Sequence, residues 1–219
     1  MSAIWIPNLA AASRSITTSS CGPALSWSEV FDGVPAGDLD VVLDIGFGGG
    51  EALIELAETR PSEHVVGIDV HTPGIAAVLD AVESRGLRNL RVVEGDVLDF
   101  VARVPRASLS TIRVFFPDPW PKRRQRGRRL IRPDVIAQLV PLLRPGGAFQ
   151  LATDAADYAT QMQTICGAEP ALHGGVIERP SWRPATRFEQ RGIDEGRSSV
   201  DLLYIASDSS PSDSSSALM

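Results

Sequence analysis

Residues 41–60 read VVLDIGFGGGEALIELAETR, and this stretch decides the fold. It begins with a short apolar run rich in β-branched residues, which predicts a strand over residues 41–45. Four glycines follow within residues 46–50, and the apolar positions after them recur at the spacing of a helix. A strand, a glycine turn and a helix in this order are typical of the opening of a doubly wound α/β sheet. In such a sheet a ligand can approach bare backbone at a helix N-terminus.

The same alternation of strand and helix continues along the chain. Further strands are predicted at residues 64–69, 90–94, 111–116, 148–153 and 200–206, and helices at residues 51–60, 73–85, 97–104, 133–143 and 155–166. We therefore expect an α/β domain over residues 38–206, with a mostly parallel, doubly wound sheet of about seven strands. Residues 1–37 are expected to form a partly flexible N-terminal segment, and the Ser- and Asp-rich residues 207–219 a disordered tail.

Composition excludes several classes of protein. The chain has 219 residues, of which 21 are basic and 27 acidic, for a net charge of −6. No apolar run approaches the roughly 20 residues that a membrane helix needs, and no charged segment followed by an apolar core marks a signal peptide. The two cysteines and three histidines lack the spacing of metal ligands. We therefore expect a cytoplasmic protein without a metal and without membrane association.

Aspartates stand at or just after the ends of five predicted strands: Asp44, Asp69, Asp96, Asp118 and Asp154. Any one of them could be merely a helix cap or a turn residue. The carboxyl ends of parallel strands gather at one edge of a sheet, however, and ligands bind at that edge. The five together predict an acidic lip that suits a ligand with hydroxyl and cationic groups better than a polyphosphate.

The glycine spacing narrows the choice of cofactor. The dinucleotide pattern G-x-G-x-x-G, counted from Gly46, needs a glycine where Glu51 stands, and no Lys-Ser or Lys-Thr pair follows as in a P-loop. A nicotinamide oxidoreductase is therefore disfavoured. S-adenosylmethionine fits better, because Asp69 is placed for the ribose hydroxyls and Asp96 for the adenine amino group. The glycine turn leaves room for the methionine portion, and Asp44 and Asp118 would favour its ammonium and sulfonium charges.

A second stretch, residues 114–129, reads VFFPDPWPKRRQRGRR. The two prolines must end the strand, so Asp118 between them is expected in an exposed turn. Residues 122–132 carry seven cations and no acid, which leaves 14 basic against 27 acidic residues in the rest of the chain. A solvated basic loop is the plain interpretation. So concentrated a patch in an acidic chain nevertheless predicts an anionic partner, and Lys122, the only lysine, places a compact charge four residues after Asp118.

We interpret this loop as a nucleic-acid site, with the carboxylate at the reacting centre and cations holding phosphates. The residues expected on the nucleic-acid backbone are Arg123, Arg124, Arg126, Arg128 and Arg129. Residues 179–197, which mix arginines with Trp182 and Phe188, are a second candidate RNA surface; the alternative is a charged connector before the last strand.

Several motifs together resemble the bacterial tRNA (guanine-N7-)-methyltransferases over residues 41–204. They are LDIGFGGG at 43–50, GIDVHTPG at 67–74, FFPDPWPKRR at 115–124, ATD at 152–154 and TRFEQRG at 186–192. The resemblance implies a Rossmann-like class I S-adenosylmethionine-dependent methyltransferase fold. It also implies methyl transfer to N7 of a guanine in the variable loop of tRNA, the forty-sixth nucleotide in standard tRNA numbering.

By the same resemblance, each expected site residue has a role. The cofactor residues are Asp44, Gly46, Gly48, Asp69, Asp96 and Asp118, and Asp118 is also the catalytic residue. The substrate-binding residues are Lys122, Asp154, Thr186, Arg187, Phe188 and Glu189. Two alternatives stay open: a methyltransferase for another RNA base or a small molecule, and an RNA-binding module without catalysis. Whether the chain is a monomer or a homodimer also stays open.

Overall fold

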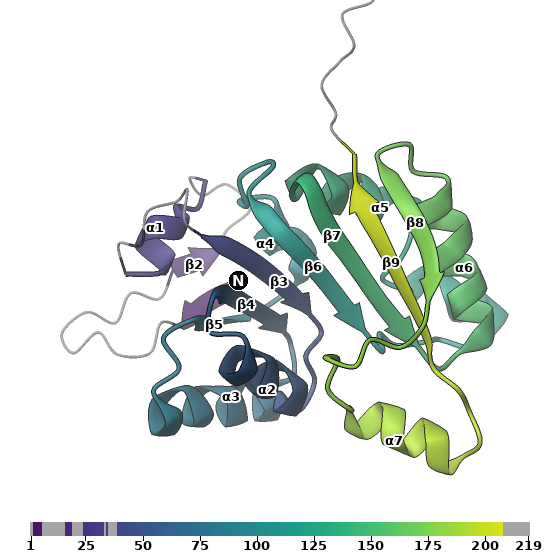
Figure 1. Cartoon of the computed structure of the whole chain (residues 1–219), viewed down its shortest axis with the longest axis horizontal. Helices are drawn as coiled ribbons and strands as arrows, with labels where there is room; N and C mark the ends of the chain where they lie inside the picture. Colours follow the sequence, from purple (N-terminus) through teal and green to yellow (C-terminus); the bar gives the residue numbers. More distant parts are fainter. Residues whose placement is uncertain (1, 6–15, 19–23, 33, 35–38, 208–219) are drawn as a thin grey trace, which may run out of the picture.

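The computed structural model describes residues 2–5, 16–18, 24–32, 34 and 39–207. Within them a single sheet runs in the order β2-β1-β5-β4-β3-β6-β7-β9-β8 (Figure 1). The strands are β1 (Ser2–Trp5), β2 (Ile16–Thr18), β3 (Asp40–Ile45), β4 (Glu63–Asp69), β5 (Leu90–Glu94), β6 (Leu109–Phe115), β7 (Leu143–Thr153), β8 (Leu172–Ile177) and β9 (Val200–Ala206). Strands β5, β4, β3, β6 and β7 are parallel, whereas the strands at both ends pair antiparallel. The predicted mostly parallel α/β sheet is confirmed.

Helices cover both faces of the sheet. They are α1 (Trp27–Val30), α2 (Glu51–Thr59), α3 (Thr72–Arg85), α4 (Val97–Val101), α5 (Pro133–Leu139), α6 (Ala156–Gly167) and α7 (Arg187–Asp194), with 3-10 helices η2 (Arg123–Arg128) and η3 (Val140–Leu142). Alternate residues of β3 point to opposite faces: Val41 and Leu43 join a core with α4, α5 and α6, whereas Val42 joins a core with α2 and α3. No helix in the described part of the chain is long and apolar enough to cross a membrane.

The glycine turn after β3 explains where α2 begins. Gly46, Gly48 and Gly50 have φ angles of +77°, +58° and +86°, in the left-handed region that other residues enter only with strain. The chain can therefore reverse within five residues and start α2 at Glu51. As a result, the N-terminus of α2 lies directly beyond the C-terminal end of β3.

The structure differs from the sequence-based expectation in several elements. Strands β1, β2 and β8, helix α7 and the 3-10 helix η2 were not predicted, so the sheet has nine strands among the described residues rather than about seven. Helix α5 ends at Leu139, and β7 already begins at Leu143. The register between β6 and β7 shifts from Leu109–Leu143 to Thr111–Ala148, so the intervening Arg144 to Gly147 form a bulge. Apart from Ser207, the predicted tail over residues 207–219 lies outside the described residues, as do most of residues 6–23.

Candidate active site

A cavity of about 240 Å³ opens at the C-terminal end of β3. Its walls are the glycine turn, the first residues of α2, the end of β6 at Phe115 and Phe116, and the residues that begin α7. Helix α7 lies just beyond the C-terminal ends of β3, β6 and β7 (Figure 1). Five of the predicted site residues line the cavity: Asp44, Gly46, Gly48, Thr186 and Arg187.

Asp44 is the buried charge of this cavity. It pairs in register with Arg113 of β6, so the two side chains share a face of the sheet. Its exposed fraction is only 5%. Burial raises the pKa of Asp44 from 3.8 to about 6, because attraction by Arg113 only partly offsets the loss of water, and Asp69 adds repulsion. A cationic ligand in the cavity would relieve this cost.

Asp69, at the end of β4, holds the glycine turn in place. One carboxylate oxygen accepts a hydrogen bond from the Gly48 backbone N–H at 2.7 Å, and the other accepts from the His71 N–H at 2.8 Å. Helix α3 packs tightly against the same turn: a Cβ on Gly74 would lie 1.7 Å from the Gly48 carbonyl oxygen. Each Asp69 oxygen keeps a lone pair for a ligand hydroxyl.

Two further strand-end aspartates, like Asp69, have structural partners. Asp96 is the N-cap of α4 and accepts from the Leu98 N–H at 2.7 Å, which is the cap role considered for any single aspartate. Asp154 accepts from Arg197 Nε at 2.8 Å. Neither residue contributes to the wall of the cavity beside Asp44.

Asp118 lies exposed in the turn after β6. The residues on either side of the turn, Phe116 and Trp120, have φ angles of +52° and +38°, which is unusual for bulky side chains. Such strain persists where surrounding contacts impose it. Here the Pro119 carbonyl accepts from Arg129 Nε at 2.7 Å. The turn therefore presents Asp118 at a fixed place next to Phe116, which lines the cavity.

The predicted basic surface forms the helix η2 and its flanks. Lys122, Arg123, Arg124, Arg126 and Arg128 are exposed, as a phosphate-binding surface requires. Arg126 also pairs with Asp157 at 3.0 Å, and Arg128 stacks over the Trp120 ring at 5.0 Å.

Arg129 differs from its neighbours. Its side chain is fully buried and donates to Asp157 at 2.5 Å and to Gln161 at 2.7 Å, both on α6, as well as to Pro119. Arg129 thus links the Asp118 turn to α6 by hydrogen bonds, and its guanidinium does not face solvent.

The residues that begin α7 split into two groups. Thr186 caps the helix by accepting from the Glu189 N–H at 3.0 Å, and Arg187 reaches across the cavity to Glu51 of α2 at 2.6 Å. Glu189, predicted to bind substrate, is buried with an exposed fraction of 3%. Arg183, in the segment interpreted as a second RNA surface, is also buried. The side chain of Phe188 lies outside the described residues.

The sequence analysis did not identify Arg113, which lies beside Asp44, as a residue of the site. It is buried on β6, donates to Gln150 at 3.1 Å and to Glu63 at 2.8 Å, and faces Asp44 across the strands. The signal was available, because an arginine at a buried position inside an apolar strand requires partners. Among the described residues no group of three or more histidine, cysteine or acidic side chains could hold a metal.

Comparison with known proteins gives a consistent result. A family model described as "Putative methyltransferase" matches residues 38–202. A tRNA (guanine-N(7)-)-methyltransferase of Acidithiobacillus ferrooxidans is 47% identical over 169 residues, which cover 75% of this chain and 74% of that protein. Proteins of the same name from Halorhodospira halophila and Streptomyces avermitilis are 44% and 41% identical and cover 74% and 84% of this chain. The matches span 64% to 74% of these three relatives.

Solved structures share the fold at low sequence identity. A 16S rRNA (adenine(1408)-N(1))-methyltransferase variant from Catenulisporales acidiphilia with its cosubstrate has a TM-score of 0.52 at 16% identity, over 80% of this chain and 89% of that one. A precorrin-6y C5,15-methyltransferase from Geobacter metallireducens has a TM-score of 0.53 at 14% identity, over 77% of this chain and 82% of that one. These likenesses confirm the predicted class I methyltransferase fold.

Proposed function

The chain belongs to the tRNA (guanine-N7-)-methyltransferase family, and we propose that it transfers a methyl group from S-adenosylmethionine to N7 of a tRNA guanine. We further propose the variable-loop guanine as the target and the cytoplasm as the place of the reaction. The observation that carries the proposal is the buried Asp44 carboxylate beside an open glycine turn, in a cavity lined by Phe116, which leads into the Asp118 turn and then the basic helix η2.

The residues of the cavity and of the neighbouring strand ends fit such a donor. Asp44 would hold a positive charge of the methionine portion, because its ionised form is costly without one. A Cβ on Gly46 would meet nothing within 4 Å, so the backbone there is open to a ligand. Asp69 would accept from the ribose hydroxyls with the lone pairs that the Gly48 and His71 N–H groups leave free. Asp96 would meet the adenine amino group with its uncapped oxygen.

The proposed reaction requires alignment of the methyl donor with the guanine rather than a general base. When bound, S-adenosylmethionine supplies an electrophilic methyl group on a positively charged sulfur. Guanine N7 carries a lone pair in the ring plane, so no side chain has to remove a proton before the N7–methyl bond forms. The transfer would move positive charge from the donor to the guanine ring as one bond to the methyl group breaks and the other forms. A fixed carboxylate near the ring stabilises that charge, and we assign this role to Asp118, together with the orientation of the guanine.

The remaining proposed contacts belong to the tRNA. Lys122, four residues after Asp118, would hold a neighbouring phosphate or the guanine O6. Arg123, Arg124, Arg126 and Arg128 are exposed on one 3-10 helix and would meet backbone phosphates. Thr186 and Arg187 would contact the substrate from the opposite wall of the cavity, and Asp154 from the end of β7.

One experiment tests the proposal directly. Unmodified tRNA transcript is incubated with the protein and methyl-labelled S-adenosylmethionine, and the product nucleosides are mapped by mass spectrometry. We expect label in N7-methylguanosine at the variable-loop position, and none when that guanine is replaced by adenine. Label in another nucleoside would support a methyltransferase of different specificity, and binding of tRNA without any transfer would support a non-catalytic RNA-binding module.

A further inference from the structure

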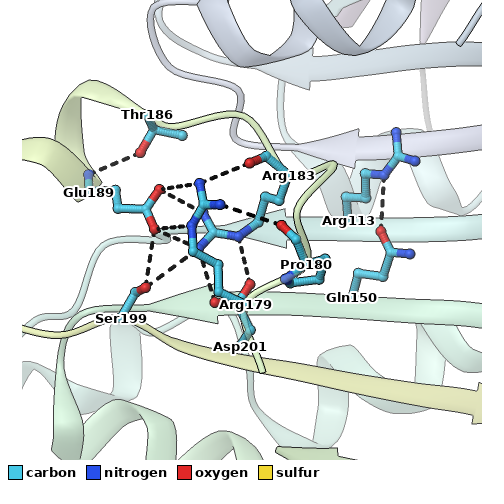
Figure 2. Close-up of polar contacts among 9 residues, drawn as sticks. All are labelled: Arg113, Gln150, Arg179, Pro180, Arg183, Thr186, Glu189, Ser199 and Asp201. Atoms are coloured by element: carbon cyan, nitrogen blue, oxygen red, sulfur yellow. Dashed lines mark hydrogen bonds and ion pairs between the residues drawn. The ribbon is translucent and has the colours of Figure 1, made fainter. Parts of the chain in front are cut away.

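A network of buried charges lies at the base of α7 (Figure 2). Arg183 is at its centre, with Glu189 of α7 on one side and Asp201 of β9 on the other. The guanidinium donates to Asp201 at 2.6 and 3.0 Å and to Glu189 at 2.7 and 3.0 Å. The exposed fractions of the three side chains are 1%, 3% and 4% for Arg183, Glu189 and Asp201. Arg183 therefore ties α7 to the sheet through two bidentate contacts that water scarcely reaches.

Glu189 has no free acceptor position for a substrate. Besides Arg183, it accepts from Arg179 Nε at 2.8 Å and Nη2 at 3.2 Å, and from Ser199 Oγ at 3.1 Å. Arg179 also donates to the Arg183 carbonyl at 2.8 Å, which fixes the two arginines relative to each other. A carboxylate offers about four acceptor sites, and the five contacts occupy them all. The geometry thus separates Glu189 from the residues that face the cavity.

The same network adjoins two residues that line the cavity, Thr186 and Arg187. Thr186 precedes Glu189 by three residues and caps α7 through the Glu189 N–H. Arg187 lies between them and spans the cavity to Glu51. Among the side chains of α7 that the structure describes, the large apolar one is Ile193, which has an exposed fraction of 55%. The described contacts that hold the start of α7 are therefore ionic and come from Glu189.

We propose that Arg183 is a positioning residue for the methyl transfer. By joining Glu189 to Asp201 it sets the N-terminus of α7 over the donor cavity, so that Thr186 and Arg187 stand at its wall. The catalytic part of this inference rests on the proposed function, whereas the placement of α7 does not. Misplacement of a positioning element by about 1 Å costs on the order of 100-fold in rate, so a weakened network should reduce turnover although Arg183 touches no substrate.

The test compares Arg183→Met and Arg183→Lys with the matched control Arg85→Met. Arg85 forms an ion pair with Glu58 on the surface, at 2.9 Å and with exposed fractions of 51% and 38%. Three quantities are measured: amide hydrogen exchange of α7 relative to β3 and β6, the dissociation constant of S-adenosylmethionine, and kcat/KM with tRNA. Loss of Arg183 should speed α7 exchange at least about 10-fold with the β3 and β6 amides unchanged.

The same variant should weaken donor binding about 10-fold and lower kcat/KM about 100-fold. Arg183→Lys should fall between wild type and Arg183→Met, because an ammonium group cannot form both bidentate contacts. Arg85→Met should match the wild type. A folded Arg183→Met protein with wild-type α7 exchange and wild-type donor affinity would overturn the inference.

A second variant keeps the inference testable if Arg183→Met does not fold. Asp201→Asn keeps the size of the side chain but removes the carboxylate charge that holds Arg183 to β9, and it leaves Arg183 and Arg179 on Glu189. Faster α7 exchange together with weaker donor binding in this variant would support the inference, and no change in either would refute it. Neither readout needs tRNA, so a wild-type protein that fails to methylate tRNA would count against the proposed function and not against the placement of α7.

Discussion

Replacing Asp44 with asparagine should stabilise the protein while weakening its donor binding. Asp44 is buried beside a cavity, and its ionised form in the free protein is compensated only in part by Arg113. Asparagine has nearly the same shape and carries no charge. The substitution therefore removes a desolvation cost from the folded state, and it also removes the charge that a cationic donor would meet.

The magnitude follows from the pKa of Asp44. The shift from 3.8 to about 6 corresponds to about 3 kcal/mol, at about 1.36 kcal/mol per pKa unit. The folded state holds a proton between these two pH values that the unfolded chain has already released. The free energy of unfolding therefore falls as the pH rises through this window, and it stays lower above the folded-state pKa. The free energy of unfolding of Asp44→Asn should not fall in this way, because asparagine does not ionise.

Urea denaturation at about pH 8 and about pH 4 measures the effect. Asp44→Asn should exceed the wild type by up to about 3 kcal/mol at the higher pH and lose this advantage at the lower pH. Calorimetry should show S-adenosylmethionine binding to the variant about 10 to 100 times more weakly, the cost of one charge-assisted contact. The exposed Asp80→Asn on α3 is the control and should change neither quantity. A stability difference that is absent, or that does not depend on pH, would refute the reasoning.

Four further substitutions test the Asp118 turn, the basic segment that follows it and the packing of α3 against the glycine turn. Asp118→Ala should lower kcat by about 100-fold or more without unfolding the protein, and a near-normal rate would remove Asp118 from the chemistry. Arg124→Ala should lower the slope of tRNA affinity against salt by about one unit. The buried Arg129→Ala should leave that slope unchanged and reduce the free energy of unfolding by about 1 to 3 kcal/mol. Gly74→Ala would place a Cβ 1.7 Å from the Gly48 oxygen, so donor binding should weaken at least about 10-fold, as titration calorimetry can measure.

Much of the fold could be predicted because local pattern and tertiary environment agree in the central strands. Residues 41–45, 64–69 and 90–94 are short apolar runs, and each is a buried parallel strand. Strand β8 escaped prediction because its sequence, LHGGVI, has two glycines and gains its structure from pairing with β9. Helix α7 escaped prediction because half of its eight residues are charged and a glycine lies within it, so it lacks a continuous apolar face. Thr186 followed by Glu189 is nevertheless the spacing of a capping box, and the Thr186 half of it forms.

The site was predictable in outline but not residue by residue. The acids do gather at the carboxyl edge, because parallel strands leave no other arrangement. A single sequence does not show which carboxylate oxygens already accept hydrogen bonds within the protein. Asp96 caps a helix, and Glu189 is held by two arginines. In the same way, nothing in a run of six arginines distinguishes Arg129, which turns inward to α6, from Arg124, which faces water.

The most direct test of the central claim is a crystal structure of the protein with S-adenosylhomocysteine, the product of methyl transfer. We predict the amino-acid portion of the ligand beside Asp44 and the glycine turn, its ribose at Asp69, and its sulfur facing the turn that carries Asp118. A ligand bound elsewhere on the sheet, or bound in the cavity with its sulfur directed away from the Asp118 turn, would contradict the account.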